Sequence, residues 1–491
     1  MSYKRSVFQA GPVKETAPVG VEVLQEEVNY KTSEGKTQTQ PAKKTEKTMS
    51  IYLSNTCEFE MQEELMGSVF SDLTLDNPEY QKALKYGKYG KTKHSPHISL
   101  FKKNVENGRV IVPRGYIKPL LKLCTQYNIQ PNIIDQRKTL KEIDFTFNGK
   151  LRDYQDEAVQ DILSDSQGVL VSPPGAGKTV IALAVIAERK QPTLILVHTK
   201  ELLNQWERRI KHFLGIESGI IGAGKMNIQP VTVGTVQTVN KHLSSLPEKF
   251  GQVVVDECHK TPASTFSHCV QAFDCRYLLG LTATPFRNDG LGELIPVHLG
   301  RTLHKTDKEK LKENGSILKP EIIRRKTSFS FDFRDNYQDM MRALIDNEER
   351  NSLIIQDLRE SLGQGETALV VSNRIDHLKN LRSLLNMEGT ELLIGKTPTR
   401  KREKIVRDLE EGRVKALFAT LSLLSEGFDC DGLSSLFITC PVKFDGNLEQ
   451  VVGRVVRPKE GKQAKVYDYM DLEQSILQGH AYQRVAVYNK L

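Results

Sequence analysis

The fold of this chain is decided by the stretch Leu170-Val171-Ser172-Pro173-Pro174-Gly175-Ala176-Gly177-Lys178-Thr179, which leads directly into Val180-Ile181-Ala182-Leu183. This order predicts a buried strand, a loop that cannot be helical, and then a helix. Gly175 and Gly177 allow backbone N–H groups to turn inward around an anion, and the positive end of the helix faces the same point. The stretch therefore predicts a phosphate-binding loop.

Two side chains of this loop add chemistry of their own. Lys178 can reach the outer phosphates of a nucleotide, and the Thr179 hydroxyl can hold Mg²⁺. Ser172 stands where the usual G-x-x-x-x-G-K-[ST] pattern has its first glycine. The plain alternative is an ordinary strand–helix turn with chance glycines. The strand before the loop, the Gly-Lys-Thr and the helix after it together favour the phosphate loop.

The composition is typical of a soluble globular protein with about three domains: 491 residues, of which 38% are hydrophobic and 26% charged. No apolar run approaches the length of a membrane helix, and none follows Lys4 and Arg5, so we expect no membrane span and no signal peptide. Seven cysteines without a C-x-x-C pair argue against a disulfide framework and a zinc site. Cys269 and Cys275 are expected to be plain thiols in a reducing compartment.

Positive charge is concentrated near the N-terminus. The whole chain has a formal net charge of +8, yet residues 80–149 alone hold fourteen basic and four acidic residues, a local charge of about +10. A polyanion is the natural partner of such a segment. Within it, residues 86–93 mix Tyr, Gly and Lys, which suits backbone contact and base stacking. A solvated basic loop remains the alternative for any single residue there.

Residues 1–48 are rich in Lys, Glu, Thr, Gln and Pro and have no sustained apolar period, so we expect a disordered tail. Residues 49–147 are expected to form a small basic α/β domain that binds nucleic acid. In it, residues 97–101 and 109–112 alternate like the two strands of a hairpin, and residues 117–127 have a helical apolar pattern.

From Leu151 onward, short Val-, Leu- and Ile-rich strands alternate with helices, which is typical of doubly wound parallel sheets. We expect an α/β fold with two tandem lobes of this kind, at 148–300 and 346–491, joined by a linker or insertion at 301–345. The expected strands of both lobes are 169–171, 193–197, 231–233, 252–255, 277–281, 367–371, 391–394, 415–419, 435–439 and 465–469.

A second chemical motif is Val253-Val254-Val255-Asp256-Glu257-Cys258-His259. An apolar strand here delivers two adjacent carboxylates to its carboxyl end, where doubly wound sheets place their ligands. Asp256 would hold Mg²⁺ through water, opposite Thr179, and Glu257 would orient and deprotonate an attacking water. Surface Asp-Glu pairs are common, but a pair that ends an all-Val strand downstream of a phosphate loop favours catalysis.

A third motif, Gln450-Val451-Val452-Gly453-Arg454-Val455-Val456-Arg457-Pro458, lies in the second lobe. Helical spacing places Gln450, Arg454 and Arg457 on one face. Two guanidinium groups there can pair with phosphate oxygens, and an arginine finger is worth about 10³–10⁵ in rate. The alternative, a basic helix end paired with acidic neighbours, does not explain Gly453, which allows the backbone to come close.

These three motifs, in this order and across two lobes, resemble those of superfamily 2 helicases with two RecA-like lobes. The Asp-Glu-Cys-His form resembles the DExH branch, and the style is similar to XPB-like repair helicases and to phage recombination and branch-migration helicases. An XPB-like Arg-Glu-Asp element is not found, which favours the phage or bacterial branch. The resemblance covers roughly Lys150 to the C-terminus.

Further segments match other motifs of that family. Residues 151–155 look like its adenine-reading element, 198–202 like motif Ia, 234–238 like motif Ic, 281–285 like motif III, and 419–429 like motif V. The resemblance implies nucleotide contacts by Arg152, Gln155, Pro174, Gly175, Ala176, Gly177, Lys178, Thr179, Gly427 and Asp429. It implies nucleic-acid contacts by Thr199, Lys200, Thr235, Gln237, Arg374 and Thr420. It implies coupling of hydrolysis to movement by His259, Thr282 and Thr284.

The resemblance implies ATP and Mg²⁺ as cofactors and a cleft that closes around ATP, with Lys178, Asp256 and Glu257 on one side and Arg454 and Arg457 on the other. We expect an ATP-dependent DNA helicase or translocase that acts on single-stranded, forked or branched DNA in repair, recombination or replication. It is expected to work as a monomer on nucleic acid, in the cytoplasm of a bacterial or phage-infected cell.

Three other functions stay open at this point. The chain could be an RNA-dependent ATPase, because the same lobes serve both polymers; the lack of an Asp-Glu-Ala-Asp box favours DNA only moderately. It could be the motor subunit of a restriction or defence complex, although we find no nuclease motif. It could also be a nucleotide-gated binding protein that is not a motor.

Overall fold

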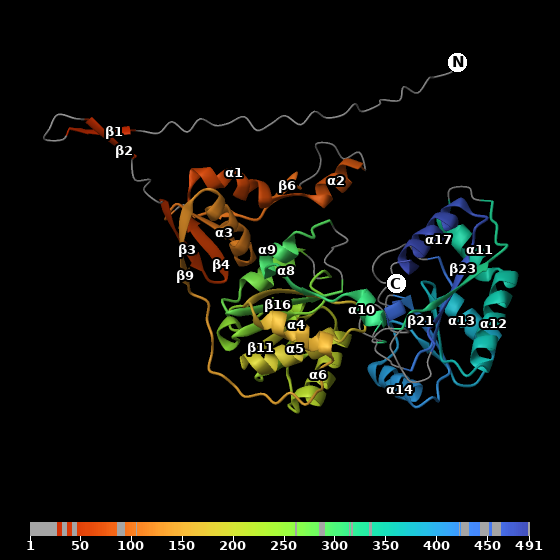
Figure 1. The fold of residues 1–491 in the computed structure, drawn as a ribbon. Coiled ribbons are helices and arrows are strands. Elements are labelled where there is room, and N and C mark those ends of the chain that lie inside the picture. The colour runs from red at the N-terminus through yellow and green to blue at the C-terminus, as the bar shows by residue number, and fades with distance from the viewer. Residues whose placement is uncertain are drawn as a thin grey trace, which may run out of the picture.

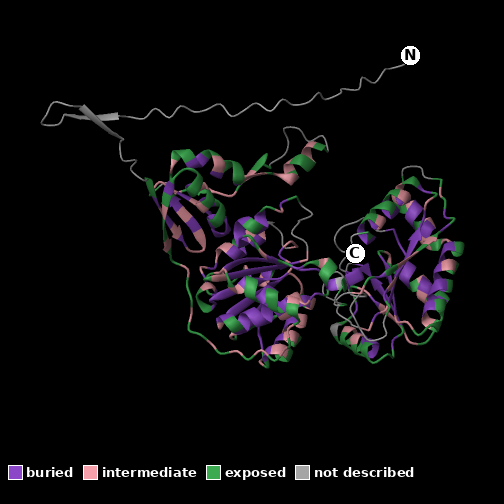
Figure 2. Ribbon diagram, in the orientation of Figure 1, coloured by how far each residue is buried: buried purple, intermediate pink, exposed green. Residues whose placement is uncertain are grey.

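Figure 1 shows the computed structural model, in which an N-terminal domain lies against the first of two α/β lobes and the second lobe lies to one side. The structure describes residues 27–31, 37–41, 47–85, 94–104, 106–260, 263–283, 290–313, 315, 318–332, 336–421, 423, 432–441, 451–453 and 463–489. In Figure 2 the sheets of both lobes are buried and the outer helix faces are exposed, so each lobe has its own core. In the part of the chain that is described, no helix has the length and apolar character needed to cross a membrane.

The N-terminal domain contains a five-stranded sheet in the order β7-β8-β4-β3-β9, in which only β3 and β9 run parallel. Its strands are β3 (Lys47–Leu53), β4 (Thr56–Glu60), β7 (Lys102–Lys103), β8 (Arg109–Pro113) and β9 (Ile129–Asp135). A separate pair consists of β5 (Thr74–Asp76) and β6 (His97–Ser99). The helices are α1 (Glu63–Asp72), α2 (Pro78–Lys85), the 3₁₀ turn η1 (Arg114–Tyr116) and α3 (Ile117–Gln126).

Two expectations for this region differ from the structure. Residues 97–101 do not pair with β8: β6 pairs with β5, and the following β7 forms the hairpin with β8. Between them, Leu100 and Phe101 turn inward and pack on the core of the domain, which ends β6. The expected tail also contains an antiparallel pair, β1 (Glu27–Lys31) and β2 (Thr37–Pro41), and β3 begins at Lys47.

The first lobe is an eight-stranded sheet in the order β13-β12-β14-β11-β15-β16-β10-β17, parallel except for β13. Its strands are β10 (Gln167–Val171), β11 (Thr193–Val197), β12 (Gly219–Gly222), β13 (Lys225–Asn227), β14 (Val231–Thr235), β15 (Gln252–Val255), β16 (Tyr277–Thr282) and β17 (Thr302–Lys305). Its helices are α4 (Asp153–Leu163), α5 (Lys178–Arg189), α6 (Lys200–Leu214), α7 (Val236–Val239), α8 (Ala263–Gln271), α9 (Leu294–Leu299) and the 3₁₀ turn η2 (Pro247–Lys249). Both faces of this sheet carry an apolar core, which explains the uninterrupted apolar strands.

The second lobe is an all-parallel six-stranded sheet in the order β18-β23-β22-β19-β21-β20. Its strands are β18 (Glu321–Lys326), β19 (Ala368–Ser372), β20 (Thr390–Leu393), β21 (Ala416–Thr420), β22 (Ser435–Ile438) and β23 (Lys465–Met470). Its helices are α11 (Tyr337–Asp346), α12 (Glu348–Gly363), α13 (Ile375–Leu385), α14 (Thr399–Glu410) and α17 (Ser475–Tyr488). The expected tandem of doubly wound parallel lobes is confirmed.

The segment expected to link the lobes is built into both of them instead. β17 pairs in parallel with β10, and β18 pairs in parallel with β23. Helix α10 (Lys308–Glu313) lies between these strands in the chain and between the lobes in Figure 1. β17 and β18 are edge strands of their sheets, and edge strands tolerate charged side chains. Their polar and charged residues therefore gave no strand pattern in the sequence.

The N-terminal domain docks on the first lobe through buried contacts. The guanidinium group of Arg114 is buried and donates to the backbone oxygen of Cys275 at 2.6 Å, while the Gln167 side chain donates to the backbone oxygen of Arg114 at 3.1 Å. Val297 of α9 is part of the apolar core of the N-terminal domain. A β-carbon on Gly115 would lie 2.5 Å from the backbone oxygen of Pro296, so only glycine permits this contact.

Candidate active site and nucleic-acid interface

The sequence motifs of the first lobe converge on one edge of its sheet. The loop of Leu170–Thr179 follows β10, Asp256 and Glu257 follow β15, and Thr282 ends β16. Because β15, β16 and β10 are neighbours and parallel, these residues share the carboxyl edge, where doubly wound sheets bind ligands. Thr199 and Thr235 follow β11 and β14, the next two strands along the same edge.

The phosphate loop has the geometry that its sequence predicts. Gly175 and Gly177 have φ angles of 86° and 82°, a region that favours glycine, and α5 begins at Lys178 directly after them. The Lys178 ammonium donates to the backbone oxygen of Ser172 at 3.2 Å and lies 3.9 Å from a Glu257 carboxylate oxygen. The lysine is therefore held across the mouth of the loop, and Thr179 occupies the next position in α5.

The adenine-reading candidates lie against the phosphate loop. Gln155 is buried on α4, accepts from the backbone N–H of Arg152 at 3.0 Å, and donates to the backbone oxygen of Ala176 at 3.2 Å. The Tyr154 hydroxyl donates to the same oxygen at 3.1 Å. Arg152 itself is exposed at the start of the helix. Gln155 thus braces the loop, and its role in recognising adenine stays a prediction.

The two adjacent carboxylates are buried and held differently. Asp256 is 6% exposed and accepts two hydrogen bonds, from the Trp206 indole N–H at 2.8 Å and from the backbone N–H of Glu257 at 3.0 Å. Glu257 has a φ of 45°, which is uncommon for a residue other than glycine and occurs mainly at functional sites. This strained backbone turns the Glu257 side chain toward Lys178.

Burial and nearby charges shift the pKa values of the two carboxyl groups in opposite directions. Burial, together with the charge of Glu257, raises the pKa of Asp256 to about 6. Burial would also raise the pKa of Glu257, but the positive charges of Lys178 and Lys260 and the neighbouring His259 lower it below its ordinary value. At Asp256 burial and the charge of Glu257 outweigh the attraction of Lys178, whereas at Glu257 the nearby positive charges prevail and keep the carboxylate ionised.

The residues present fit a magnesium nucleotide. Glycines with positive φ and a helix N-terminus suit an anion, and the raised pKa of Asp256 marks a carboxylate that a divalent cation would favour in its ionised form. The Oε2 atom of Glu257 is buried without a hydrogen-bond partner among the described residues, as expected for a group that waits for water or substrate. Thr179 and Asp256 would hold the cation, and Lys178 would hold the outer phosphates.

His259 lies between the Glu257 carboxylate and the end of β16. His259 Nδ1 lies 3.4 Å from Glu257 Oε2 and 2.9 Å from the hydroxyl of Thr282, which is fully buried at the strand end. Nearby, burial and the charge of Lys260 lower the pKa of His198 to about 4, so this imidazole is neutral. The structure therefore joins two of the three predicted coupling residues by a direct bond. The third, Thr284, lies outside the described residues.

The nucleic-acid candidates of the first lobe line the other half of the same edge. Thr199 caps α6, its hydroxyl accepting from the backbone N–H of Leu202 at 3.2 Å, and Lys200 is exposed beside it. Thr235 bonds to the Thr238 hydroxyl at 2.9 Å at the start of α7, where Gln237 is exposed. Two helix N-termini and a lysine thus face the same side, an arrangement that suits phosphate groups.

Comparison with known proteins agrees with this geometry. Residues 148–287 match the family described as "Type III restriction enzyme, res subunit", and residues 350–459 match "Helicase conserved C-terminal domain". The chain is 31% identical over 348 residues to the "Probable helicase D10" of Escherichia phage T5, covering 70% of this chain and 76% of that protein. The chain belongs to the superfamily 2 helicases. It is an ATP-hydrolysing enzyme of that family, and the resemblance of its motifs is confirmed.

Two further similarities extend over much of the helicase. It is 29% identical over 350 residues to the "DNA 3'-5' translocase XPB2" of Sulfurisphaera tokodaii, which covers 63% of this chain and 79% of that protein. A solved structure, "The crystal structure of T4 UvsW", aligns with a TM-score of 0.42 and 20% identity, over 90% of this chain and 97% of the other.

The second lobe of the helicase presents its candidates at the corresponding edge of its own sheet. Arg374 follows β19 and donates to the Gln338 side chain at 2.5 Å, and Thr420 ends the neighbouring β21, where it is buried. Gly453 lies close to the phosphate loop: a β-carbon there would be 2.6 Å from the Pro174 side chain. Gly427, Asp429, Gln450, Arg454 and Arg457 lie outside the described residues, so their predicted contacts with ATP stay predictions.

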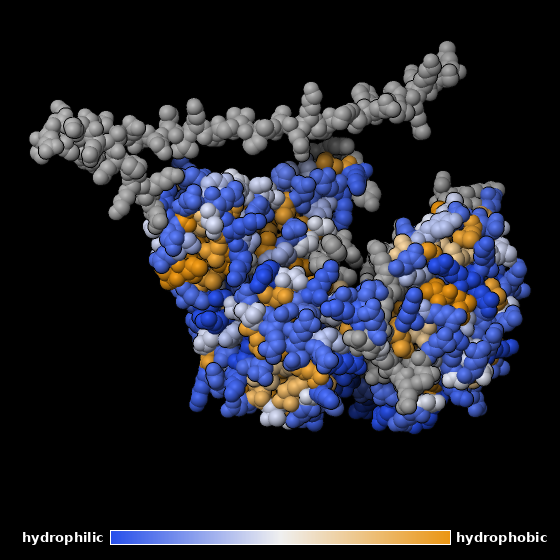
Figure 3. Space-filling model, viewed as in Figure 1, coloured by the Kyte–Doolittle hydropathy of each residue, from blue (hydrophilic) through white to orange (hydrophobic). Residues whose placement is uncertain are grey.

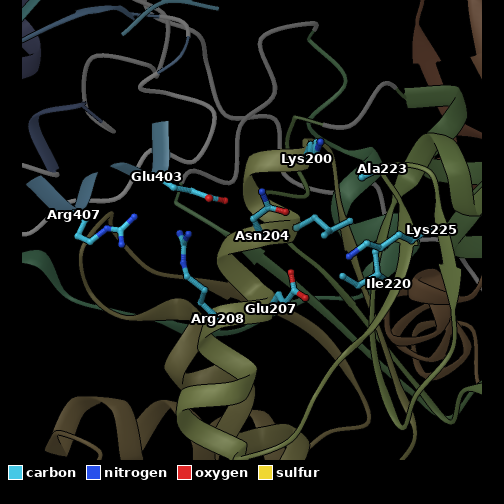
Figure 4. A pocket seen from close by; sticks show the side chains of 10 residues that line it. Lys200, Asn204, Glu207, Arg208, Ile220, Ala223, Lys225, Glu403 and Arg407 are labelled. Carbon is cyan, nitrogen blue, oxygen red and sulfur yellow. The ribbon is translucent and has the colours of Figure 1, made fainter. Parts of the chain in front are cut away.

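A groove of about 530 Å³ lies between the lobes of the helicase, and Figure 4 shows Glu403 and Arg407 of α14 facing Asn204 and Arg208 of α6. Among its lining residues, basic side chains outnumber acidic ones: Lys200, Arg208, Lys225 and Arg407 against Glu207 and Glu403. Beside it, Arg402 forms an ion pair with Glu201 at 2.5 Å across the lobes. The groove is thus a basic channel that begins at a predicted nucleic-acid contact.

Sequence reasoning missed two side chains that contact this site. Trp206 has the spacing of a core residue on α6, together with Leu203 and Ile210, and nothing in that pattern indicates a bond to Asp256. The signal that could have indicated this bond is chemical: the indole N–H of a buried tryptophan needs a hydrogen-bond acceptor. Thr306, which donates to the Ser172 hydroxyl at 3.0 Å, follows β17, whose residues lie in the segment expected to be a linker.

Proposed function

We propose that this helicase is an ATP-dependent DNA translocase that unwinds or remodels duplex or branched DNA in repair, recombination or replication. One observation carries the proposal: the nucleotide residues and the nucleic-acid candidates occupy neighbouring strand ends of one sheet, and a basic groove continues from them to the second lobe. The name of the archaeal relative, a DNA translocase, supports DNA as the polymer.

We infer a separate role for each residue of the site. Lys178 would position the outer phosphates, Glu257 would accept a proton from the attacking water, and Asp256 with Thr179 would hold Mg²⁺, which would neutralise charge on the phosphates. His259 would couple the charge of Glu257, 3.4 Å away, to Thr282, with which it forms a hydrogen bond. Arginines 454 and 457 would complete the site from the second lobe, and the closeness of Gly453 to Pro174 supports that placement.

The N-terminal domain would add affinity for duplex or branched DNA. Not all of its positive charge is free for this purpose, because Arg114 is buried in the docking interface and Arg137 and Lys138 pair with Asp135 and Asp274. Exposed lysines remain on α2, β7 and α3, and they are the residues that we expect to contact phosphate groups: Lys85, Lys102, Lys103 and Lys122.

The test compares ATPase and strand separation on single-stranded, forked, three-way and four-way DNA and on RNA. We expect DNA, and forked or branched DNA most, to raise ATP turnover in the wild type. Lys178→Ala should bind forked DNA but lose hydrolysis and unwinding by at least about 100-fold, because the phosphates lose their charged donor. Wild-type turnover that ignores every nucleic acid would refute the motor function.

Two alternatives are outcomes of the same experiment. Stimulation by RNA alone would make the chain an RNA-dependent ATPase. ATP-dependent movement without strand separation, on duplex DNA only, would favour the motor subunit of a restriction or defence complex, which the description of the first-lobe family also names. Contacts to the backbone predict that binding falls with salt, with a slope that grows with the number of phosphates neutralised.

A further inference from the structure

Trp206 is the single tryptophan of the chain, and it lies where the nucleotide half and the nucleic-acid half of the first-lobe edge meet. It is 1% exposed on α6, in the core beneath the sheet. Its indole N–H donates to Asp256 Oδ2 at 2.8 Å, a short bond to a buried carboxylate. A hydrogen bond of this length to an ionised group is stronger than one between neutral groups.

The bond fixes one particular orientation of the carboxylate. The backbone N–H of Glu257 donates to the other oxygen, Oδ1, at 3.0 Å, so each oxygen has one donor and keeps a lone pair free. With both oxygens held, the carboxylate cannot rotate about its last bond. A group that must present a lone pair toward Mg²⁺ at a set angle benefits from this constraint, as metal ligands do from the residues behind them.

The indole in turn is held by a rigid element. Helix α6 starts at the cap of Thr199 and buries Leu203, Trp206 and Ile210 in the core on one face. Trp206 is two turns from that cap, about 10 Å along the axis. The predicted nucleic-acid contacts lie at the start of this helix, and the indole of Trp206 farther along it is hydrogen-bonded to Asp256.

We propose that Trp206 is a positioning residue for magnesium: its indole N–H holds the Asp256 carboxylate in the orientation that binds the cation, and it anchors that carboxylate to α6. The inference rests on the proposed role of Asp256 in the ATPase site. A purely structural tryptophan would fill the core and would leave the dependence on Mg²⁺ unchanged, which separates the two roles by experiment.

Trp206→Phe removes the N–H and keeps an aromatic ring. With saturating ATP and forked DNA, we expect the Mg²⁺ concentration for half-maximal turnover to rise about 10–100-fold, and kcat at saturating Mg²⁺ to return to within a few-fold of wild type. Ile210→Val, on the same helix and in the same core, is the matched control, and it should lower thermal stability without moving the Mg²⁺ dependence. Equal Mg²⁺ curves for Trp206→Phe and wild type would overturn the proposal.

A second measurement, the fluorescence of Trp206, can be made on the active wild-type protein. Since the chain has one tryptophan, its emission reports residue 206 alone. Mg²⁺ with a non-hydrolysable ATP analogue should change that emission in the wild type, EDTA should reverse the change, and Asp256→Asn should abolish it. An emission that ignores Mg²⁺ and nucleotide in the wild type would refute the proposal even if Trp206→Phe failed to fold.

The failure of the proposed function would look different. If Asp256→Asn kept full ATPase activity with an ordinary Mg²⁺ dependence, the role of Asp256 itself would be wrong. If Asp256→Asn were inactive while Trp206→Phe behaved as wild type in every Mg²⁺ titration, only the role of Trp206 would fall.

Discussion

The first lobe has two neighbours, and it holds them in different ways. Its contacts with the N-terminal domain are buried. Arg114 of the N-terminal domain donates to the backbone oxygen of Cys275, and Gly115 packs against the backbone of α9. Val297 of the first lobe lies in the apolar core of the N-terminal domain. Toward the second lobe, the described contacts include the close approach of Gly453 to the Pro174 side chain, a part-exposed ion pair of Arg402 with Glu201, and a solvent-accessible groove. In Figure 3 the visible surfaces of both lobes are largely hydrophilic, with smaller hydrophobic patches.

This difference indicates which parts move together. A buried, backbone-to-backbone contact cannot slide without a steric clash, so the N-terminal domain and the first lobe should behave as one body. A polar, wet contact can open at little cost, as interfaces between mobile domains do. Nucleic acid held by the N-terminal domain would then stay fixed relative to the phosphate loop while the second lobe moves.

The largest expected effect comes from Gly115→Val. Its new side chain would collide with the backbone oxygens of Pro296 and Val297, which lie 2.5 and 2.6 Å from the position of a β-carbon, and backbone atoms cannot rotate away. We expect a loss of about 3 kcal/mol in the free energy of unfolding, or separation of the two units, measured by urea denaturation and limited proteolysis.

Gly67→Ala is the matched control for that variant. Gly67 lies within α1, and a β-carbon there would meet nothing within 4 Å. The exchange should stabilise the protein by about 0.5–1 kcal/mol, because alanine favours the helix. If Gly115→Val were as harmless as this control, the two units would not be locked together.

Acid should weaken the same docked unit. Burial lowers the pKa of His298, which is on α9 and bonds to the Ser267 hydroxyl, to about 4, against about 6.5 in an unfolded chain. The stability due to this neutral imidazole is complete above pH 6.5 and is lost as the pH falls toward 4. The free energy of unfolding should drop by up to about 1.4 kcal/mol per pH unit from this group.

The measurement compares urea unfolding of His298→Gln and wild type between pH 7 and pH 4.5. Since His198 and His377 also have lowered pKa values through burial, the wild type retains further acid sensitivity, and only the difference between the two proteins reports His298. Identical pH slopes for the two proteins would contradict the expectation.

A smaller effect is expected from Asn55→Ala at the edge of the docking interface. The Asn55 side chain donates to the backbone oxygen of Gln271 at 2.6 Å from a half-buried position. Loss of this bond should cost about 1 kcal/mol in the free energy of unfolding. No change in the unfolding midpoint would show that solvent already satisfies both groups.

The smallest effect on stability should come from the ion pair between the lobes. Glu201→Gln and Arg402→Met are each expected to change the free energy of unfolding by less than about 1 kcal/mol, because the pair is partly exposed and screened. A double-mutant cycle gives the coupling energy. A coupling above about 2 kcal/mol would mean that the second lobe is also locked, and the contrast between the two interfaces would fail.

Sequence patterns predicted most interior strands of both lobes, because five-residue runs such as Thr193–Val197 and Ala368–Ser372 are buried on both faces and need apolar residues throughout. The interior strand β12, whose four residues include two glycines, was missed. The edge strand β20 was predicted, but the edge strands β17 and β18 were missed; β18 carries Arg324, Arg325 and Lys326, whose charges are compatible with an edge. Charge also misled, since Arg114 counted as a free cation and is buried in the structure.

The candidate site divides in the same way. The motifs correctly predicted that the phosphate loop and Asp256 would share a sheet edge, because parallel strands bring their carboxyl ends together. The bonds of Trp206 and Gln155 were beyond prediction, since they depend on how α6 and α4 pack on that sheet. Contacts of this kind depend on tertiary packing, so no periodic pattern in the sequence predicts them.

The chain leaves the first lobe at a mechanically sensitive point. Thr306 bonds to the backbone oxygen of Val171 and to the Ser172 hydroxyl, so the exit of the linker is tied to the strand that carries the phosphate loop. Tension on the second lobe, from a blocked DNA track or from optical tweezers, would therefore load the nucleotide site first. Stalling force and nucleotide release should then be linked through the two bonds from Thr306 to Val171 and Ser172.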